Sequence, residues 1–346
     1  MKKEALSIKD IARVANVSHS TVSRALRNSP LVNAETAERI KKIARESNFR
    51  VSAVGRSLAT GRTNSIGVVV TTLDDPFIAE VATGVQDAAN ARGYSVVLAD
   101  SKSDPEREMK VVQLFEERRV DGIVVLSSRV GSVYVPVLAE MKIPIVLINS
   151  FHPGDFVYSV SLDNIGASRA ATRFLIQLGH KRIAYIGDRS GAQSNAARVA
   201  GYRQALENSG IPYRAELVLD GDGHPESGLR AMEQFLTSLE PPTAVFCYND
   251  MTAIGALHGV QRHGLSVPDD MSVVGFDDLT ISPYTLPPLT TVRQPKQEMG
   301  RMATEILLNL LGGSVAENSR VVKGELIVRE STAPPRATLI SLREPN

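Results

Sequence analysis

The chain lacks several features that would assign it to a class at once. It has one cysteine, Cys247, among 346 residues, which excludes an internal disulfide and a cysteine-based zinc cluster. Cys247 lies in a short apolar run and is predicted to be a buried strand residue. No apolar run approaches the roughly 20 residues that a membrane helix requires. The N-terminal sequence MKKEALSIKD has no apolar stretch or small-residue cleavage site behind it, so we expect no secretory signal and a cytoplasmic location.

Sequence motifs of the common enzyme classes are also missing. The chain contains no GxGxxG after a strand, no phosphate loop ending in GKS or GKT, no GxSxG and no HExxH. The sequence GDRSG at 187–191 has the wrong spacing for a nucleophile elbow. The six histidines are scattered, and His258 and His263 are five residues apart, which does not place them on one helix face. We therefore expect no catalytic residues, no metal and no cofactor.

Charge is nearly balanced overall but unevenly distributed. The formal net charge is +1, yet residues 1–64 contain 13 Lys and Arg against 5 Asp and Glu, so this head carries +8 and the remaining body −7. A basic head on an acidic body is typical of a protein whose head meets a polyanion. A solvated, lysine-rich surface would give the same count, so the sequence pattern has to decide.

The head has the pattern of a helix-turn-helix. The apolar residues of a first helix recur at helical spacing: Ile8, Ile11, Ala12 and Ala15. The pattern breaks at residues 16–17, and Ser18 is placed to cap a second helix. The second helix has one apolar stripe toward the first helix: Val22, Ala25 and Leu26. Asn33 is predicted to cap a third helix, and Phe49 to close the small core.

The outer face of the second predicted helix is polar. In a helix-turn-helix this helix enters the major groove, where imidazole, hydroxyl and guanidinium groups meet base edges and Arg usually reads guanine. Thr21 is expected to contact phosphate or to close the turn. The candidate DNA contacts of this segment are Ser18, His19, Ser20, Thr21, Ser23, Arg24 and Asn28. An ordinary surface helix with a solvated Arg24 is the alternative.

Residues 52–59 could form about two helical turns, which are marginal alone and further weakened by Gly55. We expect this segment to fold only against a partner. Leu58 is its one large aliphatic side chain near the end, and a leucine from each of two subunits could wedge a base step from the minor groove. Ala53 and Leu58 complete the candidate DNA contacts.

The body alternates strand-like and helical runs, which favours parallel sheets covered on both faces. Eight strand-like runs are present, and the length favours two sheets over one. Polar residues follow these strands, at the edge where ligands bind in open α/β sheets. Asp250 is expected to cap a helix, Asp75 and Asp278 to be turn carboxylates, and Gln294 to bind ligand or tie the lobes together. The candidate effector-binding residues are Asp74, Phe77, Ser127, Asn149, Ser194, Arg198, Asn249, Asp277 and Gln294.

Taken together, these residues resemble the lactose-repressor/galactose-repressor (LacI/GalR) family of bacterial transcription regulators. The stretches that carry the likeness run in order along nearly the whole chain: IKDIARVANVSHSTVSRALRNS, AETAERIKKIARESNF, AVGRSLATGRTNSIGVVV, ERRVDGIVV, LGHKRIAYIG, RVAGYRQAL, YNDMTAIGAL and PDDMSVVGFDD. In the hinge, Val51 stands where the family usually has proline, and Gly55 stands where alanine is common.

The resemblance implies an all-α helix-turn-helix headpiece and a two-lobed α/β body like that of periplasmic binding proteins. The implied parts are a headpiece at 1–51, a hinge at 52–64, a first lobe at 65–163 and 293–323, and a second lobe at 164–292 and 324–346. By motif position, the residues that resemble base-reading ones are His19, Ser20 and Arg24. Those that resemble effector contacts are Asn149, Arg198, Asn249, Asp277 and Gln294.

The expected function is that of a transcription regulator, and more specifically a repressor, which binds a palindromic operator as a homodimer under control of a small molecule. A sugar or sugar derivative is favoured, because Ala192 and Gly223 stand where purine-binding members carry an arginine and an aromatic ring. His224 or Tyr248 could supply a ring instead. A solute-binding receptor, or a regulator that responds to a purine or nucleoside, are the alternatives. The tail after Arg329 has no leucine heptad, so nothing larger than a dimer is predicted.

Overall fold

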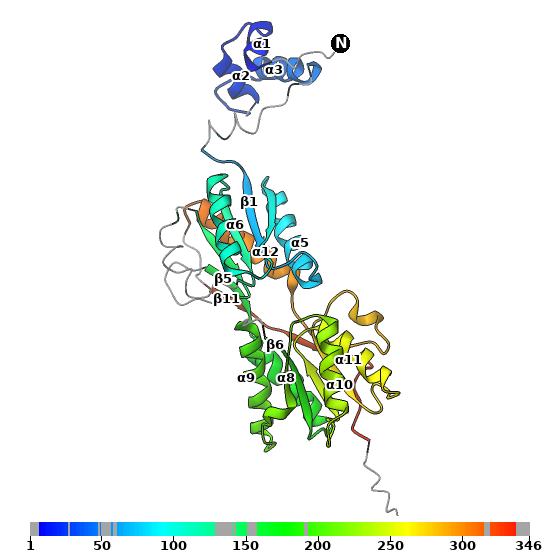
Figure 1. The fold of residues 1–346 in the computed structure, drawn as a ribbon. Coiled ribbons are helices and arrows are strands. Elements are labelled where there is room, and N and C mark those ends of the chain that lie inside the picture. Colours follow the sequence, from blue (N-terminus) through cyan, green and yellow to red (C-terminus); the bar gives the residue numbers. More distant parts are fainter. Residues whose placement is uncertain are drawn as a thin grey trace, which may run out of the picture. The chain divides into compact units, whose positions relative to one another are not determined.

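The computed structural model describes residues 7–26, 28–47, 49, 57, 61–128, 141, 143–150, 158–189, 193–314 and 319–336. The chain divides into two compact units, Met1–Thr63 and Asn64–Asn346 (Figure 1). Among the described helices, none is both long enough and apolar enough to cross a bilayer. The predicted hinge residues Val51, Ala53, Gly55 and Leu58 lie outside the described residues.

The first unit contains three helices: α1 (Ile8–Val14), α2 (His19–Leu26) and α3 (Ala34–Glu46). Helix α1 begins with a capping box between Ser7 and Asp10. As predicted, Asn33 caps α3, its Oδ1 accepting the Thr36 N–H at 2.8 Å. The core of this unit joins the three helices: Ile11, Ala12, Ala15, Val22, Ala25, Ile40 and Ala44, with Phe49 packed against it. The predicted helix-turn-helix packing is confirmed by these contacts.

The first lobe of the second unit is a six-stranded sheet in the order β11-β5-β4-β3-β1-β2. Its strands are β1 (Ser65–Val70), β2 (Ser95–Asp100), β3 (Gly122–Leu126), β4 (Ile145–Ile148), β5 (Tyr158–Leu162) and β11 (Ser319–Val322). All its pairings are parallel. The helices of this lobe are α5 (Pro76–Ala91), α6 (Pro105–Glu117) and α12 (Lys296–Leu311).

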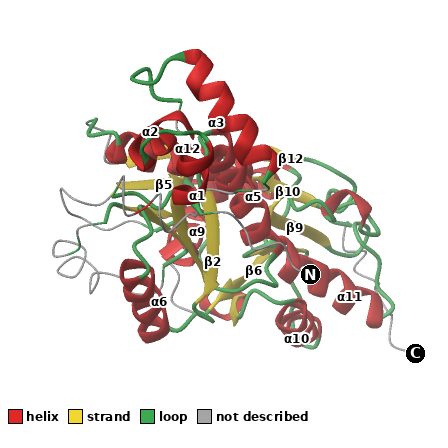
Figure 2. Ribbon diagram, turned by 90° about the horizontal axis from the view of Figure 1, so that it is seen from above, coloured by secondary structure: helices red, strands yellow, loops and turns green. Residues whose placement is uncertain are grey.

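The second lobe is a six-stranded sheet in the order β12-β10-β9-β8-β6-β7. Its strands are β6 (Ile183–Asp188), β7 (Val218–Gly221), β8 (Ala244–Cys247), β9 (Ser272–Asp277), β10 (Thr290–Arg293) and β12 (Glu325–Ile327). Only β12 is antiparallel to its neighbour. The α-helices are α8 (Asn164–Gln177), α9 (Gln193–Asn208), α10 (Pro225–Leu236) and α11 (Asp250–Arg262), with short 3₁₀ turns at Ala215–Leu217 and Ser282–Tyr284. Figure 2 shows α6, α10 and α11 outside the strands that they cover.

The chain passes between the lobes three times: from β5 to α8, from β10 to α12, and from β11 to β12. Helix α12 therefore belongs to the first lobe although it follows nearly all of the second, and in Figure 1 this orange helix lies beside α5. Two glycines allow the close approach of these helices. A Cβ at Gly84 would lie 2.1 Å from the Gln297 carbonyl oxygen, and one at Gly300 would lie 2.3 Å from the Val81 carbonyl oxygen.

The eight strand-like runs of the sequence are β1 to β4 and β6 to β9. Cys247 is buried at the end of β8, as expected. The strands that the sequence pattern did not reveal are β5, β10, β11 and β12. They are short and rich in polar or charged residues, such as YSVSL in β5 and SRVV in β11. The two-sheet α/β architecture with an all-α head is confirmed.

Candidate functional site

The outer face of α2 presents the predicted base-reading side chains to solvent. His19, Ser20 and Arg24 are exposed, while Val22 and Ala25 on the opposite face are fully buried. The spacing of a helix places residues 20 and 24 one turn apart on the same face. Helix α2 thus exposes a guanidinium, an imidazole and hydroxyls on one face, while its opposite face packs in the core of the first unit.

The two ends of α2 are held by other predicted residues. The Ser18 Oγ accepts the Thr21 N–H at 3.1 Å and lies 2.8 Å from the Thr21 hydroxyl, so Thr21 closes the turn, one of its two predicted roles. Ser23 is half-buried on the same helix. Asn28 adopts a left-handed conformation with φ 55°, and the Ser29 N–H then bonds the Arg24 carbonyl at 3.0 Å. Asn28 therefore ends the helix, as left-handed residues commonly do.

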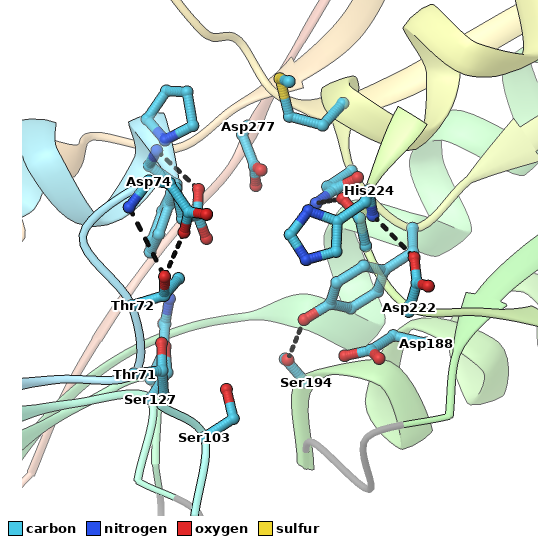
Figure 3. Close-up of a pocket in the computed structure, with 18 of the residues that line it drawn as sticks. Thr71, Thr72, Asp74, Ser103, Ser127, Asp188, Ser194, Asp222, His224 and Asp277 are labelled. Atoms are coloured by element: carbon cyan, nitrogen blue, oxygen red, sulfur yellow. Dashed lines mark hydrogen bonds between the residues drawn. The ribbon is translucent and has the colours of Figure 1, made fainter. Parts of the chain in front are cut away.

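The second unit has a pocket between its lobes, at the carboxyl ends of the strands of both sheets (Figure 3). Its volume is about 930 Å³ when the solvent-open mouth is included. All nine candidate effector residues line it: Asp74, Phe77, Ser127, Asn149, Ser194, Arg198, Asn249, Asp277 and Gln294. The structure thus gathers side chains that are up to 220 positions apart in sequence.

The first lobe contributes the segments that follow β1, β3 and β4. Asp74 accepts a short hydrogen bond from the Thr72 hydroxyl, and this bond lowers the pKa of Asp74. Asp75 caps α5 by accepting the Phe77 N–H at 2.9 Å, and its burial raises its pKa. Asn149 follows β4 with φ 54°, and its buried Oδ1 has no hydrogen-bond partner among the described residues.

Arg198 of α9 is the buried cation of the second lobe, with only 3% of its surface exposed. Its Nε donates to Asn164 Oδ1 at 2.9 Å and its Nη1 to the Tyr248 carbonyl at 2.5 Å. The guanidinium lies 3.6 Å from the ring centre of Phe276 and 4.6 Å from that of Tyr248. These two rings cover the faces of the guanidinium. Packing on all sides fixes Arg198 in one orientation.

Asp277 ends β9 and joins the arginine to the interlobe connection. Its Oδ1 lies 3.9 Å from Arg198 Nη2 and accepts the Gln294 amide N–H at 2.5 Å. Burial raises the pKa of Asp277 above its ordinary value, while Arg198 opposes that rise. The other amide atom of Gln294, Oε1, is buried and has no partner among the described residues. Gln294 thus both ties the connection to β9 and offers an unused acceptor.

One sequence expectation is wrong: Asp250 does not cap α11. The cap is Asn249, whose Oδ1 accepts the Thr252 N–H at 2.8 Å and whose Nδ2 donates to the Gly223 carbonyl at 3.0 Å. Asp250 is fully buried instead. It accepts hydrogen bonds from the Leu279 N–H and from the hydroxyls of Ser282 and Thr291. Burial raises its pKa to about 6.

Several lining residues were not among the candidates. Asp188 is the last residue of β6, Asp222 follows β7, and Thr72 and Ser103 follow β1 and β2. His224 and Tyr248 also line the pocket, and the Tyr248 hydroxyl lies 3.1 Å from Ser194 Oγ. The sequence signal for them was their place just after a strand, which applies equally to many loop residues. In Figure 3 the second-lobe residues Asp188, Asp222 and His224 face Asp74 and Thr72 of the first lobe.

Comparison with known proteins matches both parts of the chain. Residues 7–52 match the family model of bacterial regulatory proteins, lacI family, and residues 172–332 match the periplasmic binding protein-like domain. The HTH-type transcriptional repressor CytR of Escherichia coli K12 is 36% identical over 334 residues, which are 96% of this chain and 97% of that protein.

Solved structures agree with these matches. The lac repressor dimer bound to operator and the anti-inducer ONPF superimposes with a TM-score of 0.87 at 27% identity, covering 95% of this chain and all of that one. The complex of the transcriptional regulator CelR with cellobiose gives a TM-score of 0.72 at 32% identity, covering 94% of this chain and 99% of that one.

Proposed function

The chain belongs to the lacI family of bacterial regulatory proteins, and we propose that it represses transcription by binding a palindromic operator under control of a small molecule. The observation that carries this proposal is the exposed polar face of α2, held by a buried apolar core. The pocket between the lobes supplies the place for the effector. We assign no enzymatic activity to these residues. We propose that the protein acts in the cytoplasm, where the DNA is.

Arg24 is proposed to read a base edge, since it is exposed on α2 and no ion pair holds it to the headpiece among the described residues. Arg24→Ala should then cost about 1–3 kcal/mol of operator binding and little binding to random DNA. The matched control is Arg45→Ala, which removes the same charge from an exposed position on α3. The operator is first selected from random duplexes with the intact chain, and both variants are then titrated on the selected and on a scrambled sequence.

The outcomes separate the roles of Arg24. Loss on the selected sequence alone supports base reading, while equal loss on both sequences would reassign Arg24 to phosphate contact. No preference of the intact chain for any sequence, with or without ligands, would overturn the proposal as a whole. Leu58→Ala tests the predicted minor-groove wedge in the same titration, because it should weaken operator binding and leave ligand binding intact.

We propose a homodimer, because one headpiece makes few base contacts and two-fold pairing doubles them. The first-lobe edge strand β2 supports this. Its only strand neighbour among the described residues is β1. Leu98, which is 38% exposed, lines a surface hollow together with Leu73, which is 61% exposed. Exposed apolar side chains on an edge strand mark a surface that pairs. Leu98→Lys should shift sedimentation to the monomer, and Leu239→Lys, at an exposed loop leucine, should not.

The pocket is proposed to hold a sugar or sugar derivative. Hydroxyls and carboxylates line it together with the rings of Phe77, Tyr248 and His224, and such a mixture suits a ligand with an apolar ring face and a polar rim. Binding there must change operator affinity by the same factor by which the operator changes ligand affinity. A thermal-shift screen of the intact chain against sugars and nucleosides tests this, and hits confined to nucleosides would overturn the sugar assignment.

A further inference from the structure

Carboxyl groups far outnumber cationic groups in the lining of the pocket. Among the described residues that line it, five are aspartates and one is an arginine: Asp74, Asp75, Asp188, Asp222, Asp277 and Arg198. His224 is the only other basic side chain in that lining. From this balance we infer that the cleft takes an uncharged, hydroxyl-rich ligand and excludes phosphorylated forms of it. The inference rests on the proposed function and narrows its ligand class.

The single lining arginine is not available to neutralise a phosphate. Two of its N–H edges are bound, Nε to Asn164 and Nη1 to the Tyr248 carbonyl, and aromatic rings cover both faces. Its remaining nitrogen, Nη2, lies 3.9 Å from Asp277. Arginine binds phosphate best through two parallel N–H donors, and this orientation leaves at most one nitrogen toward the cleft.

Two of the helix N-termini at the pocket, those of α5 and α11, are capped by side chains of the protein itself. Such termini otherwise bind anions through unpaired backbone N–H groups. Asp75 caps α5 and Asn249 caps α11. Helix α10 begins with Pro225, which has no N–H, and the N–H of His224 before it donates to Asp222 at 3.1 Å. At the starts of α5 and α10 a ligand phosphate would therefore meet the carboxyl groups of Asp75 and Asp222 where it needs donors.

The pocket instead offers hydrogen-bond acceptors. Carboxylates accept hydrogen bonds and cannot donate them when ionised. Hydrogen bonds lower the pKa of Asp74, with that from Thr72 first. In Asp222, burial opposes ionisation, but bonds with Ser227 and the His224 N–H lower its pKa overall. Both are thus ionised near neutral pH.

Two further acceptors point the same way. The Oε1 of Gln294, a residue that is 2% exposed, and the buried Oδ1 of Asn149 have no hydrogen-bond partner among the described residues. Buried polar atoms are nearly always paired in folded proteins, so a ligand with several hydroxyl hydrogens completes them. A phosphate dianion brings only acceptors.

Nearby cations outside the lining do not reverse this balance. Arg189 and Arg230 lie 3.9 and 3.7 Å from Asp222, but both are largely exposed and their charges are screened by solvent. Lys296 is buried and donates to the carbonyls of Asp277 and Asp278, and it pairs with Glu80 at 3.4 Å. Its charge is matched by that glutamate.

The test pairs each neutral compound with its phosphorylated form. Intact chain is screened by thermal shift, and then by calorimetric titration, against sugars and nucleosides and their monophosphates, such as ribose with ribose 5-phosphate and cytidine with cytidine monophosphate. We expect every compound that binds to be neutral, with its phosphorylated partner at least about tenfold weaker, or about 1.4 kcal/mol. A phosphorylated compound that binds as tightly as its neutral partner, or a panel without any binder, overturns the inference.

Charge-removing variants show whether the aspartates cause the exclusion. In Asp74→Asn and in Asp222→Asn, the affinity for the phosphorylated compound should rise at least about threefold relative to that for the neutral compound. For the parent chain, higher ionic strength should reduce the difference between the two affinities. Asp220→Asn is the control, because it removes the same charge from an exposed position of β7 outside the pocket. An unchanged ratio in both cleft variants overturns the inference. Operator selection is measured separately, so its failure concerns the regulator and not the ligand class.

Discussion

The buried arginine of the pocket provides the sharpest quantitative prediction. Arg198→Ala removes two hydrogen bonds, the contact with Asp277 and the packing against Phe276 and Tyr248. Asp277 then remains buried without the Arg198 guanidinium, which opposes the rise of its pKa. The change should therefore abolish ligand binding and also reduce the stability of the second unit, while operator binding without ligand is retained at temperatures where that unit stays folded.

The expected loss follows from the burial of both partners, which are 3% and 5% exposed. Removing one member of a buried ion pair typically costs about 3–5 kcal/mol, because the other charge is left uncompensated. The 3.9 Å separation is longer than a direct hydrogen bond, so we expect the lower end, about 3 kcal/mol. In a double-mutant cycle, Asp277→Asn should recover part of this loss, with a coupling of about 1–3 kcal/mol.

The loss should also depend on pH. Burial already raises the pKa of Asp277 and Arg198 lowers it, so the variant raises it further. A carboxyl whose folded pKa lies above its unfolded value of 3.8 loses stability as pH rises, because the native state must give up a bound proton. The deficit of Arg198→Ala, measured by urea unfolding, should therefore be larger at pH 8 than at pH 5. A deficit below about 1 kcal/mol, or one that shrinks as pH rises, would refute this account.

Three further changes test the local structure. Asp250→Asn should destabilise the second unit by about 1–3 kcal/mol in urea unfolding, because an amide NH₂ replaces an acceptor that three donors face; equal midpoints for variant and parent would contradict this. Burial lowers the pKa of His180 below 6.5, so parent stability should fall as pH drops below about 6.5, where the unfolded chain binds a proton more readily. His180→Gln should remove that slope, and a persisting slope would assign it to another group. Ser18→Ala should lower the free energy of unfolding of the headpiece by about 1 kcal/mol, because the cap of α2 is lost. Circular dichroism can measure this loss, with Ser29→Ala as the control variant.

The strands that could be predicted from the sequence are those made mostly of apolar residues. β1, β3 and β4 are runs of Val, Ile and Leu buried on both faces, and such runs are distinctive. β10 has the sequence TTVR, and both of its threonines are nevertheless fully buried. Their hydroxyls bond Thr332 and Asp250, which are more than 40 positions away. Because those partners are unknown before folding, local pattern cannot identify this strand.

The same reason explains the exchange of roles between Asn249 and Asp250. Both can accept a backbone N–H at a helix start, and their order in the chain does not decide which one does. The structure turns Asp250 inward, where Leu279, Ser282 and Thr291 supply donors, and so Asn249 is left to cap. The nine pocket residues could be predicted because they follow strands and match positions of a family motif. The excess of carboxyl groups becomes visible only when Asp188 and Asp222 are included.

The segment from Asp277 to Lys296 connects the ligand pocket to the first lobe by covalent chain. The Gln294 side-chain amide donates to the Asp277 carboxyl group, and the Lys296 Nζ donates to the Asp277 backbone carbonyl. Lys296 is the first residue of α12. Helix α12 packs on α5 at the glycine contact, and α5 begins at Asp75 beside the pocket mouth. A ligand that engages Gln294 before α12 and Phe77 at the start of α5 therefore touches both ends of this path through α12 and α5. Because glycine packing leaves α12 and α5 no room to move apart, we expect these two helices to move as one body when one lobe moves on the other.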